Sequence, residues 1–439
     1  MDADAIVIGA GAAGLAAARA LAERSFHVIL LEARDRIGGR VWSRSIAGHV
    51  GAAELGAEFI HGPAPQTMKL LREIGIVSIP TATGESWNVE RSGELEPERD
   101  NFPLAGGFFD KARSLAADES VEQFLRRADG SEAMQEKVEW ARGFVEGFDA
   151  ADPAIASVRA IADEWRSGVD WTSARPAGGY APIFEHLRAA CAEAGVKVCC
   201  ATRVRRIAWG QRDVIVDAIG SRGASQTIRA RNAVVTLPVS VLRHRGDERG
   251  VVFEPELPPA KSQAIASIEM GHVVKVVLWF RTAFWEQLRN GRYRDAGFFR
   301  CRDLPFMAYW TQLPVRSELI VAWAAGPKAT ALHGIAPTEV IERARDGFGE
   351  LFGEPGLAQN EFEGGEMHDW SDDPFACGAY SYVAVGGSRA RAVLAEPVGE
   401  KLFFAGEAAS TDGQGGTVNG ALETGERAAA QAAASLGDT

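Results

Sequence analysis

A glycine-rich turn near the start of the chain is the first segment whose residue types and spacing could do chemistry; residues 9–14 read GAGAAG. In such a turn the first glycine permits a tight bend, the second lets a pyrophosphate approach the backbone, and the third lets a helix pack on the strand. The N-terminus of that helix offers unpaired N–H groups and partial positive charge to phosphates. We therefore expect Gly9, Gly11, Ala13 and Gly14 to bind a dinucleotide.

Charged and small residues shortly after this turn strengthen that expectation. Glu32 follows the next apolar segment, where a carboxylate can accept two hydrogen bonds from a ribose diol. We assign the adjoining Ala33 and Arg34 to the same site. Gly39 lets the backbone come close to a ligand, and Arg40 can neutralise a phosphate charge.

Three elements must position these residues. Residues 5–8 form an apolar run typical of a buried strand, 12–24 are rich in Ala and Leu and predict a helix, and 26–31 predict a second strand. A strand, a helix and a strand in this order form a βαβ unit.

The rest of the chain alternates in a way that predicts two interleaved domains. Helical patterns occupy 120–148 and 181–194, a strand is expected at 272–280, and 402–406 read as a strand before a last helix at 418–434. We expect an α/β fold, with a doubly wound Rossmann-like domain and an α+β substrate domain. The expected ranges are 1–75, 195–255 and 395–439 for the first domain, and 76–194 and 256–394 for the second.

Composition narrows the function classes. A net charge of -12 disfavours nucleic-acid binding, because phosphates would be repelled. The five cysteines are odd in number and contain no CxxC pair, which favours a reducing compartment and argues against a disulfide framework or a zinc site; we expect no bound metal. The start of the chain lacks the pattern of a signal peptide, and no apolar stretch approaches membrane-spanning length. We expect a cytoplasmic protein without a membrane segment; its oligomeric state is not readable.

The glycine turn, Glu32 and the segment 36–40 together resemble the opening of the FAD-dependent amine oxidases, which include monoamine oxidases, polyamine oxidases and lysine-specific histone demethylases. Further segments resemble the same family in the same order: 54–62, 202–204, 236–238, 404–407 and 416–421. The resemblance covers nearly the whole chain and implies that the first domain binds FAD.

The resemblance also implies which further residues contact FAD. These are Gly56, Ala57, Glu58, Val204, Trp370, Gly406, Glu407, Gly416, Thr417 and Val418. Glu407 can bind hydroxyls of the ribityl chain. The last helix would direct its N-terminus at the flavin edge where negative charge develops on reduction.

Lys275 stands inside the apolar run 273–277. Taken by itself, a lysine there is on a solvated face more often than it is buried. In the amine oxidases a lysine at the matching place holds a water near flavin N5, so the resemblance implies that Lys275 is buried beside the flavin and takes part in catalysis.

Tyr380 matches one wall of the aromatic cage that positions the amine in this family, where ring faces favour an amine. The second wall falls at Thr417, which is not aromatic, so we expect a half-open cage. Monoamine oxidases carry a flavin-linked cysteine at the place of Ala379. Alanine cannot form that bond, so we expect FAD to be bound non-covalently.

His61 and Glu58 favour one substrate class. Family members that oxidise amino acids place an arginine in this segment to bind the carboxylate, whereas this chain resembles polyamine oxidases and demethylases there. His61 and Glu58 can accept or orient protonated nitrogens. Asp163 and Glu164 could also contact a cation, but acids on a helix are usually solvated.

The expected reaction is oxidation of an amine to an imine, which water hydrolyses to a carbonyl product, with oxygen reduced to hydrogen peroxide. The expected partners are a small-molecule amine, preferably a polyamine or secondary amine, and oxygen or another electron acceptor. Two alternatives stay open: an FAD-dependent oxidase or desaturase of carbon–carbon bonds, and a redox-silent FAD-binding scaffold. Anaerobic bleaching of bound flavin by amines separates them.

Overall fold

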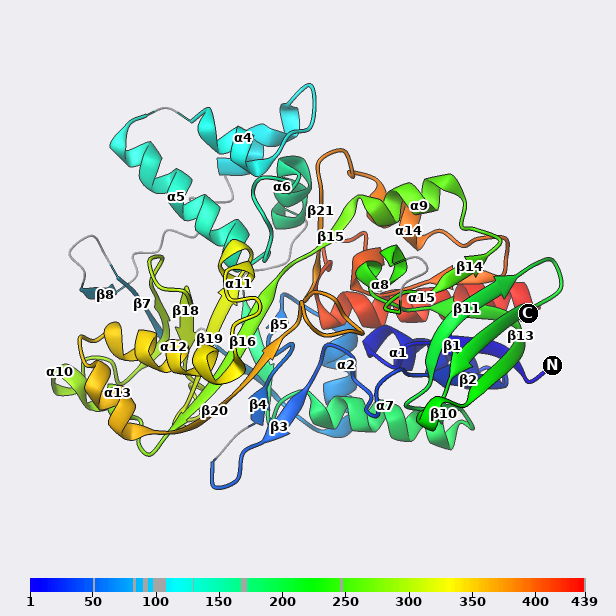
Figure 1. The fold of residues 1–439 in the computed structure, drawn as a ribbon, viewed down its shortest axis with the longest axis horizontal. Helices are drawn as coiled ribbons and strands as arrows, with labels where there is room; N and C mark the ends of the chain where they lie inside the picture. The colour runs from blue at the N-terminus through cyan, green and yellow to red at the C-terminus, as the bar shows by residue number, and fades with distance from the viewer. Residues whose placement is uncertain are drawn as a thin grey trace.

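The computed structural model consists of two large sheets with their helices, arranged side by side, and a helical lobe above them (Figure 1). The described residues are 1–49, 52–81, 84–89, 94–97, 108–128, 130–166, 172–244 and 248–437. Among them, no helix is long and apolar enough to span a membrane.

The first sheet has a parallel centre built from buried apolar strands. Its strands lie in the order β10 (Lys197–Cys199), β2 (Val28–Leu31), β1 (Ala3–Ile8), β13 (Ser225–Val235), β12 (Val214–Ile219), β11 (Arg203–Trp209) and β14 (Val252–Glu254), with β22 (Leu402–Phe404) paired to β13. Near-continuous apolar runs such as Val28–Leu31 are buried on both faces, as parallel strands require.

Helices cover both faces of this sheet. One face packs on α1 (Ala12–Ala22), α2 (Pro65–Ile74), α7 (Ala181–Glu193) and α15 (Val418–Leu436), and the other on α8 (Val239–Arg243), α9 (Pro259–Ala266) and α14 (Ala390–Ala395). The predicted α/β fold with a doubly wound first domain is therefore confirmed.

The second sheet has the order β20 (Phe362–Asp369), β16 (Val273–Phe280), β19 (Leu319–Ala325), β18 (Ala308–Trp310), β17 (Ala296–Arg300), β7 (Glu85–Val89) and β8 (Leu95–Pro97). Its outer helices are α10 (Leu288–Gly291), α11 (Pro327–Thr330), α12 (Pro337–Glu350) and α13 (Pro355–Glu361). The helical lobe consists of η1 (Asp110–Ser114), α4 (Val121–Arg126), α5 (Glu132–Gly147) and α6 (Val158–Arg166).

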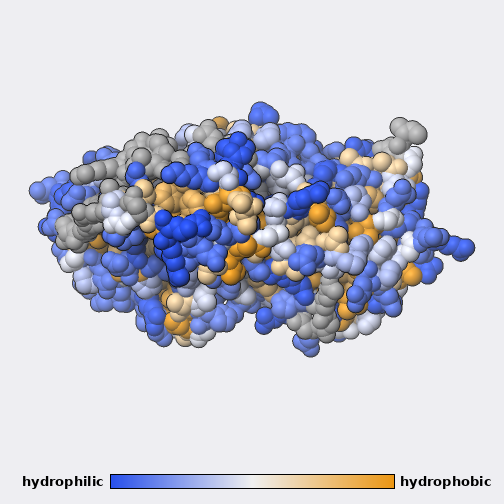
Figure 2. All heavy atoms as spheres, turned by 90° about the horizontal axis from the view of Figure 1, so that it is seen from above, coloured by the Kyte–Doolittle hydropathy of each residue, from blue (hydrophilic) through white to orange (hydrophobic). Residues whose placement is uncertain are grey.

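Small sheets join these bodies. They pair β3 (Ser43–Ser45) with β4 (Ala52–Glu54), β5 (Ile60–His61) and β6 (Ser78–Pro80) with β9 (Ser173–Pro176), and β15 (Ile268–Met270) with β21 (Ser381–Val383). Figure 2 views the molecule from the side of the lobe and shows apolar side chains, in orange, gathered among polar ones in its left half.

The helix α7 lies within the range expected for the substrate domain, yet its apolar face packs on α1 in the core of the first sheet. The same holds on the other face for α9 and α14, which pack together beside β22. The chain therefore returns to the first domain at α7, before the expected boundary at residue 195. Without α7, the apolar surface that it covers on this side of the first sheet would be exposed to water.

The glycine turn is held by a backbone contact that leaves no room for a side chain. A Cβ on Gly14 would lie 1.7 Å from the carbonyl oxygen of Gly9, and Gly9 itself has a φ of 103°. Gly14 thus lets α1 approach the end of β1, as the motif predicts.

We expect Gly14→Ala to destabilise the protein by about 1–3 kcal/mol or more, because overpacking against backbone cannot relax cheaply. Thermal unfolding of purified protein measures the effect. Gly356→Ala is the control, since Gly356 is exposed on α13 and a Cβ there has no neighbour within 4 Å. Equal melting temperatures for the two variants would contradict the packing role of Gly14.

Candidate active site

One cavity of about 1470 Å³ runs between the glycine turn and the second sheet. All the residues predicted for the site line this cavity except Gly14, which lies beneath the turn. The structure therefore brings the predicted cofactor and substrate residues into one continuous space, although they are scattered from position 9 to position 418.

The end of the cavity at the glycine turn fits an anion. Gly11 forms a bridge with Gly38 and precedes the first residue of α1, whose first N–H groups have no side-chain cap. Glu32 is buried at this end, where its carboxylate accepts hydrogen bonds from the N–H groups of Ala10, at 2.8 Å, and Arg34, at 2.9 Å. Uncapped N–H groups beside small residues suit a phosphate.

Arg34 forms an ion pair with Asp373, which the sequence did not reveal as part of the site. Burial acts to raise the pKa of Asp373, but hydrogen bonds from His368 and Arg34 outweigh it and hold that pKa below its usual range. Arg34 is therefore engaged with the protein at the wall of the cavity.

Arg40 and Glu407 are bound to each other at 2.7 Å. Glu407 also accepts hydrogen bonds from the Ser381 hydroxyl, at 2.6 Å, and the Gly416 N–H, at 3.1 Å. Burial opposes ionisation of Glu407, but Arg40 and then Arg391 hold its pKa low. Two residues predicted to bind different parts of one ligand thus form a single charged pair.

Lys275 is buried on β16, and its ammonium donates to Glu58, at 2.7 Å, and to the Gly56 carbonyl, at 3.1 Å. The solvated alternative for this lysine is therefore wrong. An ammonium has three N–H groups, so these two bonds leave one for a water or ligand.

Glu58 has two further partners that the sequence did not reveal. Arg175 on β9 donates to its carboxylate at 2.7 Å, and the indole of Trp310 on β18 donates at 3.0 Å. Burial acts to raise the pKa of Glu58, but Lys275 and Arg175 lower it, so the group is ionised. The carboxylate of Glu58 is therefore fully engaged with protein partners.

Tyr380 and His61 approach each other around the end of α5. The Tyr380 hydroxyl donates to the Phe148 carbonyl at 2.5 Å, and the His61 ring lies edge-on to the Phe148 ring with centroids 5.4 Å apart. Burial lowers the pKa of His61 to about 4, so this imidazole is neutral at pH 7. Thr417 caps α15 by accepting from the Gly420 N–H at 3.0 Å.

Trp370 lines the cavity and donates its indole N–H to the Leu55 carbonyl at 2.9 Å. Ala379 also lines the cavity, whereas Cys377 is not among its lining residues. Val204 lines the cavity and belongs to the same apolar cluster as Ile8 and Leu31 of the first sheet.

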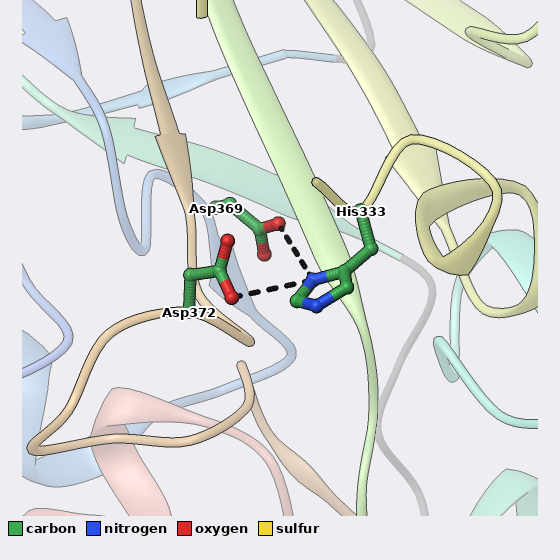
Figure 3. Close-up of side chains that lie close together, drawn as sticks. All are labelled: His333, Asp369 and Asp372. Atoms are coloured by element: carbon green, nitrogen blue, oxygen red, sulfur yellow. Dashed lines mark ion pairs between the residues drawn. The ribbon is translucent and has the colours of Figure 1, made fainter. Parts of the chain in front are cut away.

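A group of possible metal ligands lies outside this cavity. His333 contacts Asp372 at 3.2 Å and Asp369, the last residue of β20, at 3.7 Å, and the three side chains are turned toward one another (Figure 3). None of the three lines the cavity, and His333 and Asp372 are exposed, so the ion pairs account for their arrangement.

A doubly wound sheet with an anion-binding turn, joined to a second sheet across one long cavity, defines a dinucleotide-binding protein of two domains. The profile described as "Flavin containing amine oxidoreductase" matches residues 12–103 and 108–433. The chain therefore belongs to the flavin-containing amine oxidoreductase family, which confirms the resemblance seen in its sequence.

Proteins with similar sequences include histone demethylases and a polyamine oxidase. The chain is 29% identical, over 98% of its length, to "Lysine-specific histone demethylase 1 homolog 2" of Oryza sativa subsp. japonica, and spans 57% of that protein. It is 28% identical to "Polyamine oxidase 4" of the same organism, covering 97% of this chain and 87% of that one. The chain spans about half to three-fifths of the demethylase relatives it matches.

Solved structures show the same fold. Wild-type putrescine oxidase bound to putrescine superposes with a TM-score of 0.79 at 23% identity, covering 99% of both chains. Cyclohexylamine oxidase from Brevibacterium oxydans IH-35A superposes with a TM-score of 0.78 at 22% identity, again over 99% of both chains.

The charge arrangement around Glu58 predicts an order of destabilisation. Glu58→Gln leaves Lys275 and Arg175, whose side chains are 1% and 11% exposed, without their carboxylate, whereas Lys275→Met leaves Glu58 with Arg175. Breaking a buried pair costs about 3–5 kcal/mol when a charge is left uncompensated, so we expect the larger loss for Glu58→Gln.

Thermal unfolding at pH 7 measures this order. Lys69→Met is the control, because Lys69 is exposed and its nearest carboxylate oxygen, on Glu426, lies 4.0 Å away. A melting temperature of Lys275→Met below that of Glu58→Gln would show that Arg175 does not compensate the carboxylate.

Proposed function

We propose that this protein binds FAD non-covalently and oxidises an amine at a carbon–nitrogen bond. When bound, FAD would supply the hydride acceptor for this reaction, and oxygen would take up the two electrons and be reduced to hydrogen peroxide. The amine becomes an imine, and water hydrolyses the imine to a carbonyl compound and an amine or ammonia.

The observation that carries this proposal is the buried pair Lys275–Glu58, which faces the same cavity as the glycine turn. A buried ion pair is no gain for stability over apolar packing, so its place in a cavity wall favours a functional role. The remaining N–H of Lys275 can hold a water close to where the resemblance puts the flavin.

Tyr380 and His61 serve the substrate in this proposal. The hydroxyl of Tyr380 is tied to backbone, which fixes its ring as a wall against which an amine can lie. His61 is neutral and so does not repel an amine by charge. The Gly-turn end and the N-terminus of α15 would hold FAD, with Gly406, Gly416 and Val418 beside it.

Non-covalent binding is supported by Ala379, which lines the cavity at the place where monoamine oxidases carry their flavin-linked cysteine. Acid or heat denaturation followed by ultrafiltration tests it: the yellow colour should pass the membrane. Colour retained on the denatured polypeptide would contradict it.

A polyamine or secondary amine is the substrate class we favour over an amino acid. The segment 54–62 contains no arginine to bind a carboxylate. The likeness to Polyamine oxidase 4 supports the same preference. We also propose that the protein works in the cytoplasm, since its five cysteines are odd in number and include no CxxC pair.

The competing functions predict different behaviour. An oxidase of carbon–carbon bonds, or a redox-silent scaffold, would keep its flavin yellow when amines are added without oxygen. A panel of amines mixed anaerobically with purified protein, with peroxide detection on readmitting air, separates the three. Bleaching by no amine would remove the proposed function.

Lys275→Met is expected to slow reoxidation of the reduced flavin by oxygen, because the group that holds the water is lost. Stopped-flow mixing of photoreduced protein with oxygen measures this step apart from amine oxidation. Lys328→Met is the matched control, because Lys328 is also bound by backbone carbonyls but lies outside the cavity. Wild-type rates in Lys275→Met would withdraw the role assigned to Lys275.

The rate of flavin reduction should rise with pH as the substrate amine loses its proton. His61 adds no further step above about pH 5, because its pKa is lowered to about 4 and the ring is already neutral there. Anaerobic reduction rates between pH 6 and 10 give the profile. A profile that stays flat would count against oxidation of the neutral amine.

A further inference from the structure

The arginine of α14 makes contacts that the reaction above does not use. We propose that Arg391 is a positioning residue of the amine oxidation: it neutralises Glu164 at the cavity wall, so that the wall does not hold the substrate amine in its protonated, unreactive form. This inference rests on the proposed function and deepens it, because it concerns which form of the amine the same site favours.

Arg391 lies behind the cavity wall and binds two parts of it. Its Nε and Nη2 lie 3.0 and 2.8 Å from Oε1 of Glu164 on α6. Its Nη1 donates to the Ser381 hydroxyl at 2.8 Å, and its Nη2 donates to the Ser381 carbonyl at 3.0 Å. Glu164 and Ser381 line the cavity, whereas Arg391 is not among its lining residues. One guanidinium therefore joins the helical lobe to the strand that follows Tyr380.

A guanidinium suits this position better than an ammonium does. Its donors point in fixed directions in one plane, so it can serve a carboxylate, a hydroxyl and a carbonyl at once. A Cβ on Gly415, which lines the cavity, would lie 2.9 Å from the central carbon of the Arg391 guanidinium. The guanidinium thus lies directly behind Gly415 in the cavity wall.

The same network reaches the carboxylate predicted to bind FAD. The Ser381 hydroxyl, which accepts from Arg391, donates to Glu407 at 2.6 Å. Arg40 binds the other oxygen of Glu407 at 2.7 Å. Linked through Ser381, the side chains of Glu164, Arg391, Glu407 and Arg40 form a row of alternating charges that sums to zero.

Glu164 lies on the side of the amine cage. The indole of Trp165, its neighbour on α6, donates to Asp149 at 3.2 Å. Asp149 follows Phe148, whose carbonyl accepts the Tyr380 hydroxyl. Glu164, Asp149, Phe148 and Tyr380 all line the one cavity. The charge on Glu164 therefore acts on an amine that lies against Tyr380.

The charged groups around Glu164 show what opposes it. Asp149 faces it from α5, and Arg391 faces it from α14. Burial, and after it Glu164, raises the pKa of Asp149 well above its ordinary value, while Arg391 lowers it. On η1, beside α6, Arg113 is bound to Asp163 at 2.9 Å. Arg391 therefore opposes the charge of Glu164 at the cage.

The charge of the wall determines which form of an amine is favoured. Oxidation uses the lone pair of a neutral amine, whereas a carboxylate without a counter-ion favours the ammonium form. A neutral wall lets the bound amine lose its proton at a lower pH than a negative wall does. Reduction of the flavin should then begin at a lower pH as well.

The test measures anaerobic flavin reduction between pH 6 and 10 and takes the pH at half the limiting rate as the midpoint. The probe is the simplest amine that bleaches the flavin, with butylamine tried first. Arg391→Met leaves Glu164 without this counter-ion, and we expect the midpoint to rise by about one pH unit. Glu164→Gln leaves Arg391 in excess, and we expect a fall of about the same size. The double variant should return the midpoint to within about 0.3 pH unit of the wild type.

Binding is measured apart from oxidation with tert-butylamine. Its carbon next to nitrogen carries no hydrogen, so it cannot be oxidised to an imine. The change that it causes in the flavin absorption spectrum at pH 7 gives a dissociation constant. Arg391→Met should bind this ammonium about tenfold more tightly than the wild type does, yet be reduced more slowly by the reactive amine. A site that is merely damaged would bind more weakly and react more slowly.

Two further variants serve as controls. Arg391→Lys keeps the charge without the planar fork, so its midpoint should stay within about 0.3 pH unit of the wild type. Arg243→Met is the matched control, because Arg243 binds Glu269 at 2.6 Å and the Ile265 carbonyl at 3.0 Å, but neither Arg243 nor Glu269 lines the cavity. Glu164→Gln decides the matter by itself where Arg391→Met fails to fold.

The outcomes separate this inference from the function beneath it. If no amine bleaches the flavin, the proposed function fails. If amines bleach it but the midpoints of Arg391→Met and Glu164→Gln stay unchanged, or move in the same direction, the role of Arg391 is overturned. Opposite shifts that cancel in the double variant would support it, because loss of packing cannot change sign with the charge that is removed.

Discussion

The carboxylate of Glu58 is the interaction on which the geometry of the cavity depends. It joins the segment after β4 to strands β16, β9 and β18 through Lys275, Arg175 and Trp310. A buried charge is expensive unless its partners are all in place. The second sheet and the segment that lines the cavity must therefore close around Glu58 together, which fixes the ammonium of Lys275 at the cavity wall.

Patterns within short stretches of the sequence were enough to predict those helices and strands that depend on their own residues alone. The βαβ unit, the last strand and the last helix follow from apolar periodicity and from glycines whose backbone contacts exclude a side chain. The placement of α7 was not predictable in this way, because its apolar face matches either domain and only the assembled sheet determines which one it covers.

The partners of the site residues lay beyond the reach of such patterns. Arg175 is 117 positions from Glu58, and Glu407 is 367 positions from Arg40. The residue types of Arg40, Glu58 and Glu407 indicated that each could bind a ligand. They did not indicate that Arg40 would pair with Glu407, or Glu58 with Arg175. Burial of Lys275 was expected only from the family resemblance, since a single lysine in an apolar strand reads as solvated until its carboxylate is known.

Two side chains hold the end of α5 through its main chain. The Trp323 indole donates to the carbonyl of residue 147, and the Tyr380 hydroxyl donates to that of residue 148. Every amino acid has a backbone carbonyl, so these two hydrogen bonds do not depend on which side chains the lobe carries on its surface. Substitutions on the lobe can thus change the part of the cavity that α5 lines, while the position of the end of α5 relative to Tyr380 stays the same.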